Sequence, residues 1–462
     1  MNTKIKFGTD GFRGILGKEF TIETVTKIVN AIAEYLGQGT VIIGYDPRRD
    51  ADKYAKTAAN ILADFGFDVI LSSKVVPTPV IAYKAKTTKN CAGALMFTAS
   101  HNPPEYLGIK FIPNYGGPAT NEITKEIENI IESKHHKFEK LNPTVEGSVI
   151  KKDFSIDYFE ILEDLIDFDA IKLNPPKIIY DALFSASYGY FDEILKRNNI
   201  DFEIYNNKYD PNFGGFLPEP KEEFMHNKKE GSITFANDGD ADRYGVIDEK
   251  GNYVSPNIVL AMLLKYLKET KKYNGCMVKT VGVSQLVDVV AEKLNVEVIE
   301  TPVGFKYLGE AMRMNKTILA GEDSGGLSTG DYISEKDGIY ANLLILEMVS
   351  KLNKPLYQLK EEILEFAGVH FVQDRVDVKL SDDSKKEEII NEIKFLENFA
   401  NQKVVKKSEI DGVKLYLEDE KTKILIRKSG TEPLLRFYIE TDSNSKLNSI
   451  KEFIKGYVFI LK

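Results

Sequence analysis

The sequence predicts an α/β protein with three topologically similar α/β domains and a C-terminal α+β domain around a central cleft. The first observation is length, since 462 residues exceed what one hydrophobic core usually supports. The second is that helical and strand-like hydrophobic patterns alternate up to about residue 370, where grouped strands replace them. The third is that three apolar strands each run directly into a short polar loop.

Residues 1–150 are predicted to form the first α/β domain. Ile22, Val25 and Val29 begin a run of apolar residues at three- and four-residue spacing, which is typical of an amphipathic helix. Gly66 ends a second helix. The predicted elements are, in order, helix 22–36, strand 40–45, helix 51–65, strand 68–72 and strand 92–97.

Two further α/β domains are predicted over residues 151–255 and 256–370. The elements predicted for 151–255 are strand 177–182, helix 188–198 and strands 202–205, 232–236 and 244–248. Those predicted for 256–370 are a helix from Asn257, strand 276–281, helix 284–294, strand 296–301, helix 305–314 and strand 317–320. Helices alternate with strands in both, which identifies each as α/β.

Residues 371–462 are predicted to form a separate α+β domain, because their strands follow one another directly. The predicted elements are a strand, a long charged helix through 381–400, strands 413–418, 422–427 and 434–440, and a terminal helix.

The three strands that end in polar loops suggest a common site. They lead into Ser100, Asp238 and Glu322, one in each of the first three domains. Open α/β sheets hold ligand-binding loops at the carboxyl ends of their strands. Three such domains facing one cleft would bring these side chains together.

Composition excludes several classes of protein. No apolar run approaches the ~20 residues that a membrane-spanning helix needs, and the N-terminus lacks a secretory signal pattern, so a cytoplasmic protein without a membrane partner is predicted. A net charge of −9 argues against nucleic-acid binding, which requires a basic face. Cys91 and Cys276 are too few and too far apart for a metal site or a disulfide framework, and both are expected to be buried.

The strongest local signal is residues 238–243, which read Asp-Gly-Asp-Ala-Asp-Arg. Carboxylates at alternate positions of a tight loop can converge on one hard divalent cation. The spacing also resembles a calcium-binding loop, but Arg243 stands where that loop needs glycine, and strands flank the segment. Three protein ligands leave coordination positions open, which suits Mg²⁺ held partly by phosphate and water.

Ser100 follows a strand and precedes His101-Asn-Pro-Pro, so its hydroxyl is expected on a rigid exposed turn. A serine hydrolase is one interpretation, but the G-x-S-x-G elbow is absent. A hydrogen-bonded turn without chemistry is another. With a Mg²⁺ site elsewhere in the chain, Ser100 is a reasonable phosphoryl carrier and Lys110 a candidate acid/base or phosphate contact.

Three other loops are ambiguous when each is taken alone. Residues 427–433 combine a guanidinium, two hydroxyls and a glycine, which suits a phosphate site or an ordinary hairpin turn equally. Residues 9–14 would either connect two elements or place Arg13 in the cleft. Residues 322–326 offer a carboxylate and a hydroxyl to vicinal sugar hydroxyls, or form a plain turn.

Taken together and in this order, five segments resemble those of the α-D-phosphohexomutase family. They are 8–14 (GTDGFRG), 98–103 (TASHNP), 238–243 (DGDADR), 321–325 (GEDSG) and 427–433 (RKSGTEP). Five segments in register cover essentially the whole chain and are specific to the family, whereas any one of them is not. The resemblance implies three similar α/β domains and a smaller fourth domain around a deep cleft.

The same resemblance implies a role for each segment. Ser100 would be the phosphorylated residue and would share Mg²⁺ with the three aspartates Asp238, Asp240 and Asp242. The reacting end of the cleft would be lined by Arg13, His101, Lys110 and Arg243. The substrate would be bound by Lys306, by Glu322 and Ser324 at the sugar hydroxyls, and by Arg427, Ser429, Gly430 and Thr431 at the phosphate that is not reacting.

The implied reaction begins when phosphorylated Ser100 donates its phosphoryl group to a hexose 1-phosphate. The resulting bisphosphate turns around in the cleft and returns its other phosphate to Ser100. The implied cofactors are Mg²⁺ and glucose 1,6-bisphosphate, as activator and intermediate, and the partner is the hexose phosphate substrate. The fourth domain would close over the substrate and exclude water.

Two features bear on which sugar is used. Gly326 stands where bifunctional mannose/glucose enzymes and glucosamine enzymes of the family usually carry histidine, which weakens the glucosamine interpretation. Residues 301–306, with Lys306, resemble glucose-preferring members. These two features favour a phosphoglucomutase, with phosphomannomutase as the alternative and phosphoglucosamine mutase as a weaker one. A third departure, Leu107, occupies a position where the family often has asparagine; it bears on the details of the serine loop and not on the sugar or on the phosphorylation.

Two rival classes remain. A magnesium-dependent phosphatase would use the same sites but leave the cleft open to water. A sugar-phosphate-binding regulator would keep the fold without the chemistry, but such a protein should have lost Ser100 or one of the three aspartates, and all four are present.

Overall fold

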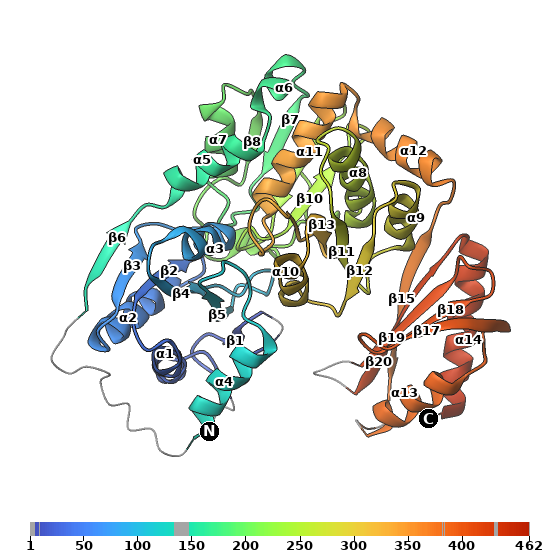
Figure 1. The fold of residues 1–462 in the computed structure, drawn as a ribbon, viewed down its shortest axis with the longest axis horizontal. Coiled ribbons are helices and arrows are strands. Elements are labelled where there is room, and N and C mark those ends of the chain that lie inside the picture. The colour runs from blue at the N-terminus through green and yellow to red at the C-terminus, as the bar shows by residue number, and fades with distance from the viewer. Residues whose placement is uncertain are drawn as a thin grey trace.

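The computed structural model describes residues 5–8, 10–133, 147–380, 382, 384–428 and 433–461, except for the side chains of 458–461. The described residues form four sheets that follow one another along the chain (Figure 1). The predicted fold class is therefore confirmed, with three α/β units followed by a unit of grouped strands.

The first sheet has the strand order β1-β5-β4-β2-β3-β6. Its strands are β1 (Phe12–Ile15), β2 (Thr40–Tyr45), β3 (Asp68–Ser72), β4 (Cys91–Phe97), β5 (Tyr106–Pro113) and β6 (Val149–Lys152). Its helices are α1 (Ile22–Leu36), α2 (Ala51–Asp64), α3 (Thr78–Thr87) and α4 (Asn121–Glu132). Leu107 pairs with Gly14 across β5 and β1 and is buried in this unit's core, so its role there is packing.

The second sheet has the order β10-β9-β7-β8. Its strands are β7 (Ile178–Asp181), β8 (Glu203–Tyr205), β9 (Ile233–Asn237) and β10 (Tyr244–Ile247). The helices before and between them are α5 (Ser155–Leu165), α6 (Phe168–Leu173) and α7 (Phe191–Arg197), and a short 3₁₀ helix covers Phe213–Gly215.

The third sheet has the order β12-β11-β13-β14. Its strands are β11 (Cys276–Thr280), β12 (Val298–Thr301), β13 (Thr317–Gly321) and β14 (Leu327–Thr329). Its helices are α8 (Pro256–Glu269), α9 (Gln285–Lys293), α10 (Phe305–Met314), α11 (Gly338–Leu352) and α12 (Leu356–Ala367).

One topology occurs in all three of these sheets. The runs β5-β4-β2-β3, β10-β9-β7-β8 and β14-β13-β11-β12 each contain three parallel strands and, at one end of the run, one antiparallel strand. In each run the third strand in sequence order carries the polar loop at its carboxyl end. These strands are β4, β9 and β13, which lead to Ser100, Asp238 and Glu322. The similarity that the sequence predicted is therefore a repeat of strand order.

The fourth sheet is antiparallel throughout, with the order β15-β20-β19-β18-β17-β16. Its strands are β15 (Val372–Lys379), β16 (Asn398–Phe399), β17 (Gln402–Ser408), β18 (Val413–Leu417), β19 (Lys423–Lys428) and β20 (Leu434–Thr441). Its helices are α13 (Lys385–Phe395) and α14 (Asn444–Leu461).

The helix predicted through 381–400 is wrong in extent. Helix α13 ends at Phe395, and a hairpin of β16 and β17 follows. Ala400 and Asn401 both have positive φ, 49° and 60°, which a helix cannot contain but a two-residue hairpin turn requires. The charged helical pattern obscured this turn in the sequence.

The largest core cluster extends across the second and third sheets and also includes residues of the first unit, such as Ile42, Ile81 and Met96. Helix α11 belongs to the third unit by sequence, yet it packs against β9 and β10 as well as α8 and β14. Residues 338–350 of this helix are all buried. This stretch therefore presents no face to solvent, and it joins the two units into one packed body.

Two compositional expectations can be compared with the structure. Cys91 and Cys276 are both buried and unpaired, as predicted, and burial raises the pKa of the Cys91 thiol to about 11. Among the described residues, no helix combines the length and the apolar character needed to cross a bilayer.

The shared position of α11 leads to a stability prediction. We expect Leu343→Ala to lower the free energy of unfolding by about 2–5 kcal/mol, because the fully buried side chain leaves a cavity. Leu352→Ala, at the 37% exposed end of the same helix, is the matched control and should cost clearly less. Urea denaturation followed by circular dichroism measures both, and equal losses would contradict the central role of α11.

Candidate active site

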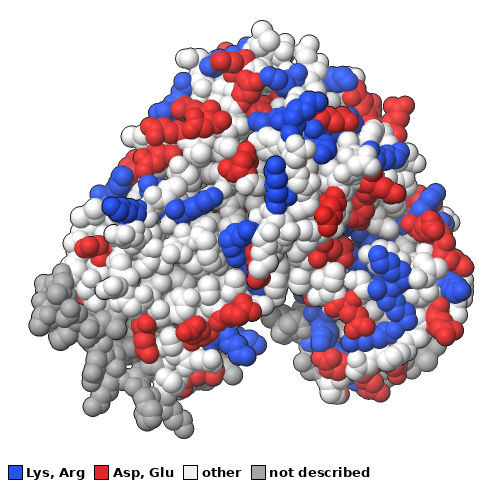
Figure 2. Space-filling model, viewed as in Figure 1, with Lys and Arg blue, Asp and Glu red and all other residues white. Residues whose placement is uncertain are grey.

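The loops after β4, β9 and β13 meet at a cavity of about 510 Å³ between the units. Figure 2 shows the molecule notched at its lower edge, between the parts built on the first and fourth sheets. Among the described residues, five cationic and three acidic side chains line the cavity, so this part of the lining has a surplus of positive charge. The charged lining residues are Lys6, Arg13, Arg243, Lys336 and Arg427, and Asp10, Glu322 and Asp323.

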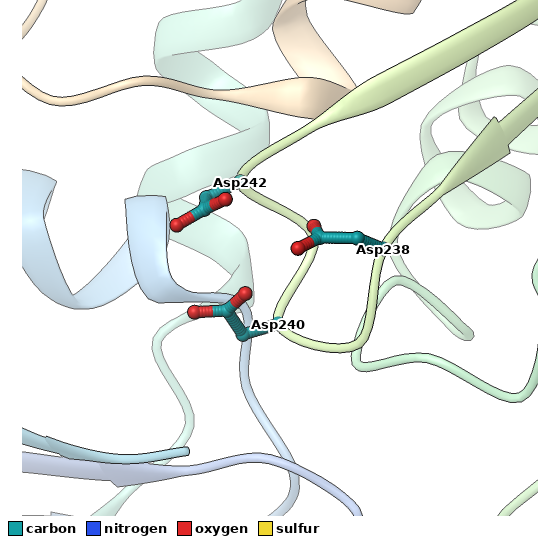
Figure 3. Close-up of side chains that lie close together, drawn as sticks. All are labelled: Asp238, Asp240 and Asp242. Atoms are coloured by element: carbon teal, nitrogen blue, oxygen red, sulfur yellow. The ribbon is translucent and has the colours of Figure 1, made fainter. Parts of the chain in front are cut away.

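Asp238, Asp240 and Asp242 present their carboxylates to one point (Figure 3). One oxygen from each lies within 4.8 Å of the others, and all three residues are fully buried. The Oδ1 atoms of Asp240 and Asp242 have no hydrogen-bond partner. Burial and the two neighbouring carboxylates raise the pKa of Asp238 well above its ordinary value. Such oxygens fit a hard divalent cation such as Mg²⁺.

Ser100 lies beside this triad. Its Oγ donates to Asp238 Oδ2 at 2.9 Å and lies 3.3 Å from His101 Nδ1. Its backbone is in the left-handed region, with φ of 51°, which is unusual for a residue other than glycine. The side chain predicted to carry the phosphoryl group is therefore next to the carboxylates predicted to bind the metal.

The serine loop and the aspartate loop pack backbone against backbone. A Cβ at Gly239 would lie 2.3 Å from the carbonyl oxygen of Ser100, so only glycine fits between the two loops. Thr78, at the start of α3, donates from Oγ1 to Asp240 Oδ2 at 2.6 Å. The first and second units are thus joined at the site itself.

Lys110 on β5 pairs with the triad from the first unit. Its Nζ lies 2.8 Å from Oδ2 of both Asp240 and Asp242, and 2.7 Å from Asp10 Oδ2. Burial disfavours its charge, yet these three carboxylates raise its pKa well above the ordinary value. The ammonium group is therefore charged in this structure and partly neutralises the carboxylates.

Two residues at the site were missed by the sequence analysis. Asp10 contacts Lys110, and Lys336 lies 3.1 Å from Asp242 Oδ2 and 3.5 Å from Asp10 Oδ2. Asp10 lies within the glycine-rich segment 9–14, where only Arg13 had been singled out. Lys336 comes just before α11 and belongs to none of the quoted motifs, so no local signal marks it.

Three more predicted residues line the cavity, namely Arg13, His101 and Arg243. Arg13 Nη1 donates to Asn102 Oδ1 at 2.6 Å, and the Arg243 amide donates to Asp238 Oδ1 at 2.9 Å. Burial, together with the charges of Arg243 and Arg13, lowers the pKa of His101 to about 2. The imidazole is therefore neutral near pH 7.

The segment after β13 forms a tight turn at the cavity. The Glu322 amide donates to Gly326 O at 2.9 Å, and the side chains of Glu322 and Ser324 line the cavity. A Cβ at Gly326 would lie only 2.6 Å from Cδ of Lys336. The missing side chain at Gly326 thus leaves the room that the Lys336 stem occupies.

The structure separates the predicted phosphate contacts. Arg427 lines the cavity, and its Nη2 lies 2.8 Å from Asp411 Oδ2, while its Nε has no partner. Lys306 does not line the cavity, because its Nζ donates to Asn121 on α4 at 2.7 Å. Ser429, Gly430 and Thr431 lie outside the described residues.

Family models cover nearly the whole chain. Residues 4–137, 156–251 and 255–366 match the models described as phosphoglucomutase/phosphomannomutase alpha/beta/alpha domains I, II and III. Residues 375–456 match the model of the C-terminal domain of the same proteins. The four matches occur in the order of the four sheets.

Whole proteins match over the same extent. A phosphoglucosamine mutase of Clostridium beijerinckii is 32% identical over 96% of both chains, and a Methanosphaera stadtmanae protein named as a probable phosphoglucosamine mutase is 31% identical over 98% of both. A crystal structure from Thermus thermophilus, provisionally assigned as a phosphomannomutase, superposes with a TM-score of 0.85 at 31% identity. It covers 99% of this chain and 100% of its own. The chain therefore belongs to the phosphoglucomutase/phosphomannomutase family, the α-D-phosphohexomutases, and is an isomerase.

Proposed function

We propose that this phosphohexomutase interconverts glucose 1-phosphate and glucose 6-phosphate through a phosphorylated Ser100 and a 1,6-bisphosphate intermediate. The observation that carries the proposal is the contact of Ser100 Oγ with Asp238, at the edge of three buried carboxylates. A hydroxyl in this position can carry a phosphoryl group whose charge is balanced by a metal ion and nearby cations.

The proposed Mg²⁺ ligands are Asp238, Asp240 and Asp242, together with the phosphoryl oxygens on Ser100. When bound, Mg²⁺ would offset the negative charge of the phosphoryl group as it is transferred. Glucose 1,6-bisphosphate is the proposed activator, because it can phosphorylate Ser100 in a protein that has not yet turned over. The domain boundaries proposed from the sequence remain 1–150, 151–255, 256–370 and 371–462.

In the proposed step, the phosphorus–oxygen bond to Ser100 breaks as a bond forms to a hydroxyl of the sugar phosphate. Ser100 Oγ leaves, and the hydroxyl proton would pass to the neutral imidazole of His101, which lines this end of the cavity. Lys110 already carries its proton, so it would serve as the acid that protonates the leaving oxygen or as a contact to the phosphoryl group. Arg13 and Arg243 would stabilise the charge on the transferring oxygens.

The far end of the cavity is proposed to hold the rest of the substrate. Glu322 and Ser324 would accept and donate hydrogen bonds to sugar hydroxyls, and Arg427 would bind the phosphate that is not reacting. Arg427 has an unpartnered buried N–H at the cavity wall, which suits an anion. The residues proposed to complete this phosphate site are Ser429, Gly430 and Thr431. Lys306 is proposed to join them only if its Nζ leaves Asn121, to which it donates in this structure.

The preference for glucose over glucosamine rests on charge. Glucosamine phosphates carry a protonated amine at C2, whereas glucose carries a neutral hydroxyl. Lys336 places a buried ammonium near Glu322, in a cavity whose described lining holds more cations than carboxylates, and this disfavours a second ammonium. The second candidate is phosphoglucosamine mutase activity, which the names of the similar curated proteins favour. Phosphomannomutase activity remains a third.

The phosphoserine assignment leads to the first functional prediction. After incubation with Mg²⁺ and glucose 1,6-bisphosphate, peptide mass spectrometry should find one phosphoryl group on Ser100. Ser100→Ala should lose turnover by at least about 10³-fold while keeping its circular dichroism spectrum, because the carrier hydroxyl is gone. Ser72→Ala, at a buried serine that ends β3, is the control and should stay active. Binding of glucose 1,6-bisphosphate without phosphorylation of Ser100 would favour the sugar-phosphate-binding regulator. Release of inorganic phosphate would favour the magnesium-dependent phosphatase.

The assignment of the aspartates as metal ligands leads to the second functional prediction. We expect Asp240→Asn to raise the Mg²⁺ concentration for half-maximal activity by about tenfold or more, because one charged ligand is lost. It should also reduce the rise in melting temperature caused by Mg²⁺. Asp248→Asn, at a buried carboxylate that caps the turn after β10, is the control. A Mg²⁺ titration identical to that of the unchanged protein would mean that the aspartate loop is only a turn.

The assignment of glucose phosphates as substrates leads to the third functional prediction. The protein should show a higher kcat/KM for glucose 1-phosphate than for glucosamine 1-phosphate. Lys336→Met should reduce that ratio by about tenfold, which corresponds to about 1.4 kcal/mol of charge repulsion removed. Lys271→Met removes a lysine paired with Glu347 away from the cavity and should leave the ratio unchanged. A protein that prefers glucosamine 1-phosphate would establish the second candidate instead.

A further inference from the structure

Arg48 is a buried residue that none of the roles above involves. It follows β2 and is 2% exposed. Its guanidinium donates to four backbone carbonyls of the serine loop: Nη2 to Ser100 O at 2.6 Å and Asn102 O at 2.7 Å, and Nη1 to Pro103 O at 2.8 Å and Tyr106 O at 3.1 Å. The loop is therefore folded around this one side chain.

Asp46 completes the arrangement. Its Oδ2 accepts the fifth donor, Arg48 Nε, at 3.2 Å, so every N–H of the guanidinium is used. The same oxygen accepts Thr98 Oγ1 at 2.6 Å, and Thr98 Oγ1 in turn accepts the Ser100 amide at 2.8 Å. A continuous chain of hydrogen bonds therefore runs from Arg48 back to Ser100.

Both backbone polar groups of Ser100 are thus held, its carbonyl by Arg48 and its N–H by Thr98. A left-handed conformation at a residue other than glycine persists only where its surroundings over-determine it. The φ of 51° is such a case, and it directs Oγ to Asp238.

Arg48 also contacts the second unit. Its Cζ lies 4.9 Å from the centre of the Phe213 ring, and the carbonyl that it binds at Ser100 is the one that packs on Gly239. Arg48 thus helps to fix the position of the serine loop relative to the aspartate triad, because it contacts the second unit as well as the loop.

We propose that Arg48, oriented by Asp46, is a positioning residue that holds Ser100 in the conformation required for phosphoryl transfer. This proposal rests on the proposed function of Ser100. Arg48 itself would touch neither the substrate nor the phosphoryl group. A displacement of about 1 Å at a reacting atom can cost about 10²-fold in rate. The effect should therefore fall on kcat rather than on KM.

The test is Arg48→Lys, which keeps the charge but cannot reach four carbonyls and Asp46 at once. We expect kcat to fall by about 10²-fold, KM for glucose 1-phosphate to change by less than about threefold, and phosphorylation of Ser100 by glucose 1,6-bisphosphate to slow in parallel. Thr98→Val removes only the hydroxyl link and should show the same pattern with a loss of about tenfold, even where Arg48→Lys fails to fold.

Leu62→Ala is the control for destabilisation alone, because Leu62 is fully buried in the core of the same unit. At an equal loss of melting temperature it should keep its kcat. The proposal is overturned if Arg48→Lys becomes phosphorylated and turns over at the unchanged rate. Where Arg48→Lys does not fold, the same result with Thr98→Val overturns it. It is also overturned if Leu62→Ala loses as much activity as these variants. These results leave the proposed function standing. Failure of the unchanged protein to become phosphorylated overturns both.

Discussion

The burial of three carboxylates at one point is the constraint on which the rest of this structure depends. Asp238, Asp240 and Asp242 are shielded from water. Because their mutual repulsion is strong in this buried environment, cations must be brought to them. Lys110 and Lys336 supply two charges, each also drawn toward Asp10. Two lysines shared among four carboxylates leave the point short of positive charge, which is the imbalance that a divalent cation would correct.

This constraint explains why the site needs several units. The three aspartates follow β9 in the second unit, Lys110 lies on β5 in the first, and Lys336 precedes α11 in the third. The repeated strand order places one polar loop at the carboxyl end of the same strand in each unit, and packing by α11 fixes two of these units as one body. No unit alone could balance the charge or enclose the cavity.

The sequence was informative where chemistry is local. The three aspartates at alternate positions predict a metal site by their spacing alone, whereas the serine loop is assigned only together with that metal site and the other four segments. The structure brings Ser100 into contact with Asp238. Lys336 and Arg48 act over long sequence separations, through contacts that only the folded chain creates, so no spacing could reveal them. The same holds for α11, whose apolar sequence predicts burial but not that it is shared, and for the turn at Ala400, where left-handed residues interrupt a helical charge pattern.

The far end of the cavity is charged but would bind a phosphate only weakly, which is what an intermediate that must turn around would require. Arg427 is bound to Asp411, whose Oδ2 also accepts the Val303 amide of the third unit at 3.0 Å. A phosphate that arrives at Arg427 must displace the Asp411 carboxylate, and this competition weakens its net binding. In the proposed reaction such a site would hold either phosphate of the bisphosphate without retaining it. An arginine with no competing carboxylate would bind more tightly and release more slowly, which would oppose the turn that the reaction needs.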